Sequence, residues 1–410
     1  MTTTESPIEA PASHRKLLLS LFPANVSMFL LWGAIPSILL ALQVEGIDPD
    51  NKAGNLAIVY TIGALAAMIA QPLGTVSDRT RSKYGRRAPW IVGGALVGGL
   101  GLIGMAAANT LVQIGIGWVI VQIAYNFCQG PLSAIMPDRV PPAVRGMFSA
   151  VAGFAMMLGA IGGQLIGAAF ADDIGGGYVL FAGLALVTFT LFVVISPDRD
   201  NRADERRPFD LGALLRTFYF NPRKHPDFGW AFIGRLLLYL GYFMVSNYQL
   251  YILQEYIGLG DDAVNKVAVL GGASLIPTLI ATLLGGPLSD RLKRRKPLIY
   301  LASIICGVAL LIPWLMPTLT GMVIFSMLNG FGFGLFGSVD TALVSEVLPA
   351  QEDAAKDLGV INIAATLPQV FAPGVAGAIV VATGYGSLFP IAIVLMILGG
   401  FAVWPIKTVR

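Results

Sequence analysis

Two oppositely charged residues, Arg235 and Asp340, lie inside long apolar stretches of the sequence. An unpaired charge inside a membrane costs roughly 3 kcal/mol or more. Each residue lies a few positions from the same end of its stretch, so their depths match, and we predict that they pair directly or through water. The spacing leaves open whether the pair would clamp a substrate, carry a proton or tie two helices together.

Amide and aromatic side chains recur at helical spacing in similar apolar stretches. Gln122, Asn126 and Gln129 follow an i, i+4, i+7 pattern, which places them on one side of a helix. Amides hydrogen-bond to hydroxyl groups, and flat rings cover the C–H face of a sugar. This pattern predicts a site for a neutral, polyhydroxylated ligand, whereas for any single residue a hydrogen bond between helices is the alternative. The predicted ligand-binding residues are Gln122, Tyr125, Asn126, Gln129, Arg235, Tyr239, Tyr242, Asn329, Phe333, Asn362 and Gln369, and Asp340 is the candidate proton-carrying residue.

One loop motif occurs twice in the chain. Gly74 and Asp78 recur as Gly286 and Asp290 at an offset of 212 residues, and further along Asp138 aligns with Glu346 at an offset of 208. A nearly constant offset over such a length indicates duplication, so we expect two related halves that keep the same acid and base positions. The glycines and charged residues around these positions are Gly74, Asp78, Arg79, Arg86, Arg87, Asp138, Arg145, Gly286, Asp290, Arg291 and Glu346.

The composition predicts a membrane protein. The chain is 55% hydrophobic and 12% charged, whereas soluble domains carry about 25% charged residues. Continuous apolar runs long enough to cross a bilayer of about 30 Å predict helices and exclude a transmembrane barrel. The twelve expected spans are 20–43, 54–76, 89–109, 111–136, 147–170, 177–196, 228–256, 266–288, 297–317, 319–344, 357–383 and 386–405.

Most basic residues fall in alternate loops, which by the positive-inside rule predicts that both termini are cytoplasmic. The basic clusters are therefore read as topology signals, and no nucleic acid partner is expected. We expect a cytoplasmic tail over 1–19, a six-helix bundle over 20–196, a linker over 197–227, a second six-helix bundle over 228–405 and a short cytoplasmic tail over 406–410. No signal peptide is expected.

The linker contains apolar residues at helical spacing, which predicts an amphipathic helix on the membrane surface; an unstructured linker is the alternative. These residues are Leu211, Leu214, Leu215 and Phe218.

Several other chemistries are not expected. Cys128 and Cys306 lie in predicted spans, which argues against a disulfide, and His14 and His225 lie outside them, which argues against a histidine relay in the membrane. The chain lacks metal-ligand spacing, a phosphate-binding glycine loop and a nucleophile–histidine pairing. We therefore expect no enzyme activity, cofactor or metal.

The first loop motif resembles that of the major facilitator superfamily. The likeness rests on Gly74, Asp78-Arg79 and Gly85-Arg86-Arg87; the loop is four residues longer than the usual form and ends in Pro89-Trp90-Ile91, which resembles the sucrose-transporter and glycoside–pentoside–hexuronide symporter branch. The resemblance implies an all-α membrane protein with twelve helices in two pseudo-symmetric bundles, and a cavity lined by the first, fourth, seventh and tenth helices. It also implies that Asp78 lies near the start of the eleventh helix and closes a cytoplasmic gate. Nearby arginines would pair with Asp138, and Asp290 with Glu346 would repeat the scheme in the second half. The glycines and charged residues named above for the two loop copies are then the predicted gate residues.

A second resemblance concerns coupling. Asn126, Gln129, Gly130 and Pro131 resemble a segment of plant sucrose transporters, which carry an aspartate where this chain has Gln122. That acid couples transport to H⁺ or Na⁺ in the family, and glutamine cannot titrate. Asp340 therefore becomes the leading candidate for proton coupling, ahead of Glu255 and Asp357.

These observations predict a secondary transporter that moves a small-molecule substrate, a sugar or glycoside, across the plasma membrane by alternating access. H⁺ is the expected coupling ion, ahead of Na⁺. The alternatives are an exporter of drug-like or metabolite molecules, an uncoupled facilitator, and a non-transporting receptor on the same fold.

Overall fold

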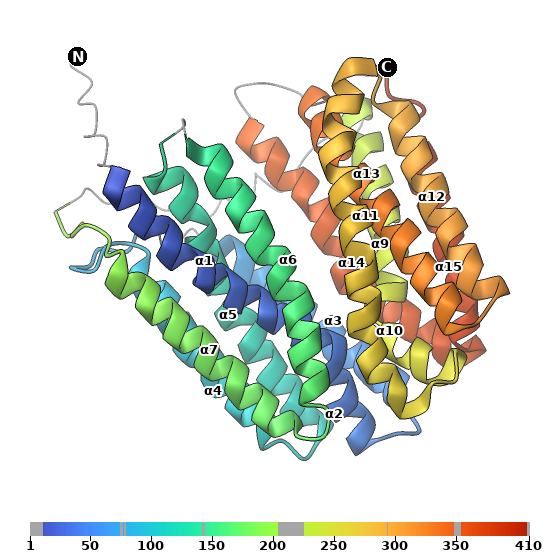
Figure 1. The fold of residues 1–410 in the computed structure, drawn as a ribbon, viewed down its shortest axis with the longest axis horizontal. Coiled ribbons are helices and arrows are strands. Elements are labelled where there is room, and N and C mark those ends of the chain that lie inside the picture. The colour runs from blue at the N-terminus through green and yellow to red at the C-terminus, as the bar shows by residue number, and fades with distance from the viewer. Residues whose placement is uncertain are drawn as a thin grey trace. The chain divides into compact units, whose positions relative to one another are not determined.

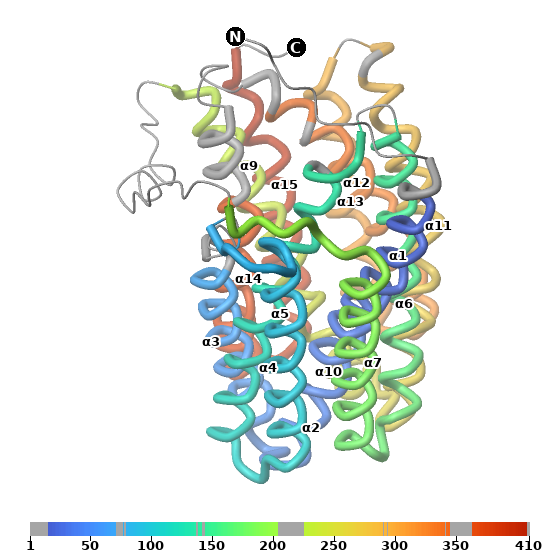
Figure 2. The backbone as a smooth tube through the Cα atoms, turned by 90° about the vertical axis from the view of Figure 1, so that its left-hand side faces the viewer, coloured from blue at the N-terminus to red at the C-terminus, as the bar shows by residue number. Residues whose placement is uncertain are grey.

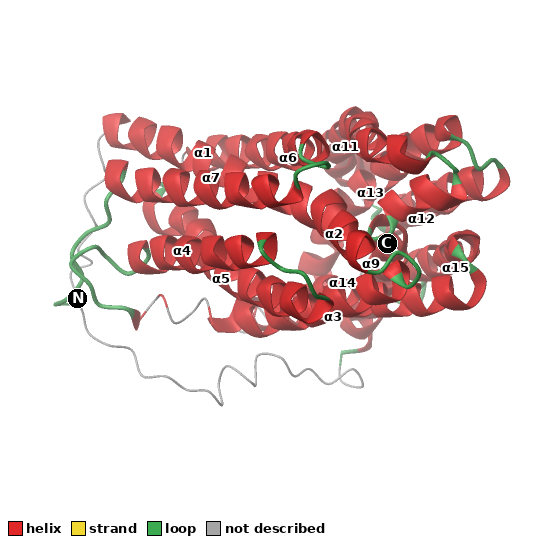
Figure 3. Ribbon diagram, turned by 90° about the horizontal axis from the view of Figure 1, so that it is seen from below, coloured by secondary structure: helices red, strands yellow, loops and turns green. Residues whose placement is uncertain are grey.

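The computed structural model describes residues 11–73, 77, 79–141, 144–203, 225–292, 294–347 and 354–407. Every regular element in these residues is a helix (Figure 3). The predicted linker helix with Leu211, Leu214, Leu215 and Phe218 lies outside the described residues.

The apolar helices correspond to the twelve predicted spans. Within the described residues, 11 helices are long and apolar enough to cross a membrane, and the last predicted span forms a shorter apolar helix over Tyr385–Phe401. The elements of the first part are α1 (Pro11–Ala34), η1 (Ile35–Leu39), α2 (Leu40–Ile47), α3 (Lys52–Leu73), α4 (Ala88–Ala106), α5 (Leu111–Arg139), α6 (Arg145–Ala169) and α7 (Ile174–Ile195). Those of the second part are α9 (Pro226–Ser246), α10 (Gln249–Tyr251), η4 (Ile252–Tyr256), η5 (Gly260–Asp262), α11 (Ala263–Leu292), α12 (Lys296–Leu315), α13 (Leu319–Val347), α14 (Ala354–Thr383), η6 (Tyr385–Ser387) and α15 (Leu388–Phe401).

The chain divides into two compact units. Unit 1 comprises Met1–Gln43 and Leu65–Pro208, and unit 2 comprises Val44–Ala64 and Phe209–Arg410. Residues 44–64 therefore pack within unit 2, although they come early in the sequence. The predicted bundle limits, 20–196 and 228–405, stay predictions.

The duplication is visible in how helices pack inside each unit. In unit 1, α1 packs against α6 and α7, and α4 packs against α5 and α7 (Figures 1 and 2). In unit 2, α9 packs against α14 and α15, and α12 packs against α13 and α15. When the long apolar helices are numbered in order within each half, the same pairs are in contact: first with fifth, first with sixth, third with fourth and third with sixth.

Glycine permits the close approach of α4 to α5 and of α12 to α13. A Cβ at Gly98 of α4 would lie 2.6 Å from the Tyr125 ring of α5, and one at Gly94 would lie 2.6 Å from Cys128 Sγ. In unit 2 the glycine and the cysteine exchange helices: Gly332 lies on α13 and approaches Cys306 of α12. A Cβ at Gly332 would again lie 2.6 Å from the sulfur. Both buried cysteines are free thiols that fill helix–helix packing.

Two predicted spans are not uniform α-helices. The span expected over 20–43 contains the π-helical turn η1, whose second residue, Pro36, has no N–H to donate. The span expected over 228–256 ends as an α-helix at Ser246 and continues through α10 into the π-helical turn η4. Single π turns inside helices often mark functional sites.

The packing of Gly98 leads to a stability prediction. Gly98→Ala should force the Tyr125 ring to move, and overpacking of this kind costs about 1–3 kcal/mol. We expect the melting temperature of the purified protein in detergent to fall by several degrees. Gly93→Ala is the matched control on the same helix, because an added Cβ there meets nothing within 4 Å. Equal melting temperatures for the two variants would contradict this account of the α4–α5 contact.

Candidate substrate and gating sites

Arg235 of α9 and Asp340 of α13 form a buried ion pair within unit 2. Arg235 Nε lies 3.2 Å from Asp340 Oδ2, and the two side chains are 10% and 5% exposed. The predicted pairing is confirmed. The contact lacks the geometry of an aligned hydrogen bond at Nε, so it is mainly electrostatic.

Aromatic rings from the same two helices surround this pair. The Arg235 guanidinium carbon lies 5.8 Å from the centre of the Tyr239 ring, within reach of a cation–π attraction. Phe333 stacks on Tyr242 with ring centres 4.2 Å apart and meets Tyr239 edge-on at 5.3 Å. Phe336 meets Tyr239 edge-on at 6.1 Å. Unit 2 thus places a charged pair next to a wall of flat rings.

The amides predicted for unit 2 differ in their placement. Asn329 of α13 is 8% exposed, and its Oδ1 has no hydrogen-bond partner in the described part of the chain. A buried unpaired amide oxygen is costly, so a rearrangement that brings a donor to this atom would be favourable. Gln369 is exposed and, within the described residues, donates only to the Ala365 backbone oxygen of its own helix, at 3.5 Å. The side chain of Asn362 lies outside the described residues.

The predicted polar stripe of α5 lies in unit 1. Asn126 Nδ2 donates to the Gln122 backbone oxygen at 2.7 Å and to Gln122 Oε1 at 3.2 Å. Gln122, Asn126 and Gln129 are all half-buried. Tyr125 is fully buried, with its ring against Gly98 and its hydroxyl without a partner among the described residues. The structure therefore gives Tyr125 a packing role between α4 and α5.

Trp118 extends this stripe, and the sequence reasoning missed it. It lies one helical turn before Gln122, is 1% exposed, and has an indole Nε1 without a partner in the described residues. Its ring meets Trp32 of α1 edge-on, with ring centres 6.2 Å apart. The i, i+4 spacing from Trp118 to Gln122 was the available signal.

The predicted gate of unit 1 centres on Asp138, near the end of α5. Asp138 Oδ2 lies 2.7 Å from Arg87 Nη2 and 2.8 Å from Arg86 Nη2. Arg87 is buried and also donates from Nη1 to Ser77 Oγ at 2.9 Å. The expected pairing of arginines with Asp138 is confirmed.

The remaining gate residues of unit 1 are placed as follows. Arg145 Nε donates to the Val140 backbone oxygen at 2.9 Å, so this arginine stays close to the end of α5. Arg79 is half-buried in the loop that follows α3. Gly74 and Asp78 lie outside the described residues.

Unit 2 repeats one contact of this gate. Arg295 Nη1 donates to Ser289 Oγ at 2.5 Å, just as Arg87 donates to Ser77. Ser289 and Arg295 align with Ser77 and Arg87 at the offsets of 212 and 208 residues, so the repeat could have identified both pairs. The side chains of Asp290 and Glu346 lie outside the described residues, Arg291 is exposed, and a Cβ at Gly286 would meet nothing within 4 Å.

The extended loop of unit 1 is held by the segment after α7. Asn201 is buried, accepts from the Ser82 backbone N–H at 2.9 Å, and donates to the Thr80 backbone oxygen at 2.8 Å. Trp90 Nε1 donates to Thr80 Oγ1 at 2.6 Å. Gly85 has a φ of +82° and packs against Asp198, which explains glycine at this position. The four extra residues thus form an ordered part of the loop.

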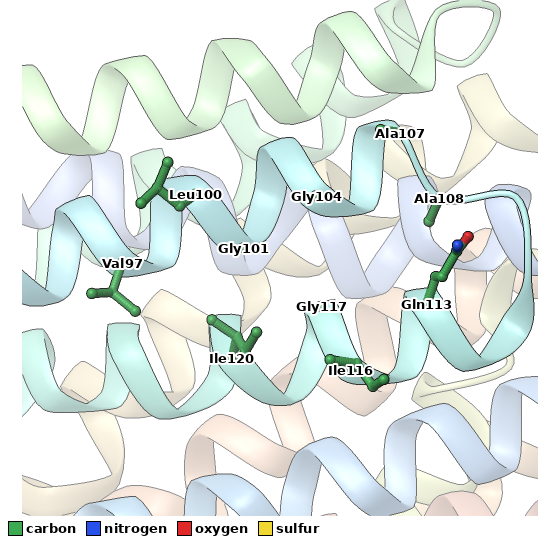
Figure 4. Close-up of a pocket in the computed structure, with 10 residues that line it drawn as sticks. All are labelled: Val97, Leu100, Gly101, Gly104, Ala107, Ala108, Gln113, Ile116, Gly117 and Ile120. Carbon is green, nitrogen blue, oxygen red and sulfur yellow. The ribbon is translucent and has the colours of Figure 1, made fainter.

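Two apolar grooves in the described residues do not coincide with the predicted ligand-binding set. One, of about 550 Å³, lies between α4 and α5 and has Gln113 as its polar lining residue (Figure 4). The other, of about 570 Å³, lies between α3 and α14 and has Thr61 as its polar lining residue. Their linings of small and aliphatic side chains offer little to a polyhydroxylated ligand.

Comparison with known proteins identifies relatives by sequence. Residues 51–405 match the family described as MFS/sugar transport protein. The chain is 29% identical over 234 residues to the MFS transporter asaE of Aspergillus flavus, covering 56% of this chain and 50% of that protein. It is 32% identical over 120 residues to the sucrose transport protein SUC4 of Arabidopsis thaliana, covering 24% of each. The chain therefore matches at most about half the length of these relatives.

Solved structures show the fold. A mutant of the nucleoside transporter NupG superposes with a TM-score of 0.80 at 15% identity, covering 95% of this chain and 99% of that one. A D-xylose–proton symporter superposes with a TM-score of 0.72 at 16% identity, covering 97% and 98%. The fold is thus the twelve-helix fold of these transporters, and the match over residues 51–405 means that this chain belongs to the MFS/sugar transport protein family of the major facilitator superfamily.

Proposed function

We propose that this transporter moves a sugar or glycoside across the membrane by alternating access, coupled to protons through Asp340. The observation that carries the proposal is the buried Arg235–Asp340 pair beside Tyr239, Tyr242 and Phe333. The family match and the sucrose transport relative support a sugar as cargo.

The chemistry of the lining favours a neutral, hydroxylated ligand. Stacked rings such as Tyr242 and Phe333 suit the apolar face of a sugar, and Asn329 has a free acceptor for one of its hydroxyls. Gln122 and Asn126 offer further amides in unit 1. Asp340 is paired with Arg235, so it does not present the unpaired acid that a cationic drug would require.

Coupling follows from the electrostatics of the pair. While Asp340 is ionised it neutralises Arg235, and protonation of the carboxylate removes that attraction. An uncompensated guanidinium inside the membrane is costly, so the released Arg235 would bind a polar ligand more tightly. Proton and substrate would then favour each other's binding by the same factor.

Location and orientation form part of the proposal. The basic loops support cytoplasmic termini through the positive-inside rule, and we place the protein in the plasma membrane. Asp138 with Arg86 and Arg87 would then act at the cytoplasmic end of unit 1, as a set of ion pairs that forms and breaks in the transport cycle.

The first prediction concerns Asp340→Asn in reconstituted vesicles. Counterflow with a panel of mono- and disaccharides should identify a cargo, and a pH gradient should drive its accumulation. Asp340→Asn should keep exchange but lose accumulation, because an amide cannot carry the proton. Asp261→Asn, at an exposed acid in the short helix η5, is the control and should behave as the parent protein.

Two results would count against this proposal. Accumulation that survives in Asp340→Asn would remove Asp340 from coupling. Export of a lipophilic dye, together with no exchange of any sugar, would overturn the cargo.

A second prediction separates structural pairing from substrate binding. Arg235→Met alone leaves Asp340 buried without its partner, and removal of one member of a buried pair costs about 3–5 kcal/mol. Arg235→Met with Asp340→Asn should recover much of the lost melting temperature but not sugar exchange. If the double variant regains sugar exchange, Arg235 only stabilises the fold and does not bind the substrate. If the double variant melts no higher than Arg235→Met, the unpaired Asp340 is not the cause of the lower melting temperature.

A third prediction concerns the gate of unit 1. Asp138→Asn removes the charge that two arginines share, so exchange should slow and the melting temperature should fall. Asp200→Asn is the matched control, because Asp200 pairs with Arg202 in an exposed position where ion pairs contribute little. Equal effects on exchange from both substitutions would show that Asp138 does not gate transport.

A further inference from the structure

A second charged cluster lies in unit 2, away from the Arg235–Asp340 pair. Lys52 Nζ, at the start of α3, lies 2.6 Å from Glu45 Oε1 and 2.7 Å from Glu255 Oε1. Gln254 Nε2 donates to the other oxygen of Glu45 at 3.1 Å. The ammonium also lies 4.8 Å from the centre of the Tyr251 ring. Lys52 thus joins α2 and α3 to the π-helical turn η4.

Tyr248 makes a second connection beside this cluster. Its hydroxyl is placed to donate to the backbone oxygens of Ala53 at 3.1 Å and Pro373 at 3.0 Å, and the residue is fully buried. Gly377 of α14 allows this approach, because a Cβ there would lie 2.7 Å from the Tyr248 hydroxyl and would also collide with Ala57 of α3. One phenol therefore holds α3 against α14.

The loop before Lys52 is ordered by its own contacts. Asp48 accepts hydrogen bonds from the side chains of Asn55 at 2.9 Å and Asn51 at 3.2 Å. These bonds, the one from Asn55 most, lower the pKa of the Asp48 carboxyl below its usual value. The loop is thus built to present Lys52 to its two carboxylates.

The charges of the cluster depend on one another. The Lys52 side chain is 11% exposed, and the Glu45 side chain is 25% exposed. The Glu255 side chain is 48% exposed. Because both carboxylates contact the same ammonium, loss of Lys52 would leave two like charges close together, which is unfavourable even though water screens the exposed Glu255. Loss of Lys52 alone should therefore do more than remove one contact, because it makes the remaining pair repulsive.

The cluster occupies a specific end of unit 2. It lies where α9 ends and α11 begins, whereas the basic residues 291–296 lie at the opposite end of α11. Segment 44–64 begins within α2, which follows the π-helical turn η1, and Glu255 lies in the π-helical turn η4. Both sides of the cluster thus adjoin irregular turns that can absorb a change in helix direction.

We propose that Lys52, Glu45, Glu255 and Tyr248 form a clasp that holds segment 44–64 in unit 2 and must open in each transport cycle. The clasp rests on the proposed alternating-access function, in which contacts that close each side of the membrane must break in turn. These residues are then a second gate, at the end of unit 2 that lies away from its basic loop.

Cross-linking tests the clasp without any substrate. In a background with Cys128→Ala and Cys306→Ala, Gly54→Cys and Val381→Cys place thiols on α3 and α14, where a Cβ at Gly54 would lie 3.7 Å from Val381 Cγ2. The two positions are thus in side-chain contact, and a disulfide between them requires a Cβ–Cβ separation of about 3.5–4.5 Å. With copper phenanthroline in vesicles, the pair should cross-link readily in the parent chain. Lys52→Met should slow cross-linking at least about five-fold, the lower end of typical coupling between conformations.

Matched variants keep this test informative. Lys52→Arg retains the charge, so its cross-linking rate should stay within about two-fold of the parent. That change would be smaller than the roughly five-fold effect at the lower end of typical coupling. Lys266→Met removes a lysine for which no ion pair occurs within the described residues and should have no effect. If Lys52→Met does not fold, Glu255→Gln and Tyr248→Phe are milder and should each slow cross-linking. Equal rates for the Lys52 and Lys266 variants, or for the parent and both milder variants, would overturn the clasp.

The transport readout is separate. The Gly54–Val381 disulfide should stop sugar exchange, and reduction should restore it; continued exchange by the cross-linked protein would show that the clasp does not open in the cycle. If no cargo is found at all, the proposed function fails, but the dependence of cross-linking on Lys52 still decides whether the clasp holds segment 44–64.

Discussion

The cost of a charge inside a membrane is the constraint on which this account depends. Arg235 and Asp340 each lie in a membrane-spanning helix, where a charge without a partner is costly. Their pairing therefore follows from the physics of the site. It also makes the site responsive, because a proton on Asp340 or a polar ligand on Arg235 changes the balance that keeps them together.

Groups of opposite charge recur near helix ends at two other places in the described residues. Asp138 is shared by Arg86 and Arg87, and Lys52 is shared by Glu45 and Glu255. In each case three charges of mixed sign are grouped, so that removal of one leaves an imbalance. Groups of this kind are suited to gating, because movement of a single helix end separates the charges and removes their attraction.

Much of this could be predicted from the sequence because membrane spans and duplications leave strong periodic signals. The spans and the Arg235–Asp340 pair followed from apolar length and depth, and the pairing of arginines with Asp138 followed from the resemblance of the loop motif to a known family. Tyr125 shows the limit of that reasoning. Its spacing placed it near the polar stripe, but its ring packs between α4 and α5, where Gly98 leaves room for it. Which neighbour a helix face meets depends on packing between distant segments. The Lys52 cluster was hidden for the same reason, since Glu45 and Glu255 are 210 residues apart in the sequence.

Proton movement that accompanies sugar entry is the most direct test of the central claim. A sugar that the protein exchanges would be added to lightly buffered vesicles with no imposed gradient, and the external pH would be recorded. The account predicts that the external solution becomes more alkaline with the parent protein, and that this signal is absent with Asp340→Asn although exchange continues. Sugar entry without any pH change in the parent, or an unchanged pH signal in Asp340→Asn, would contradict it.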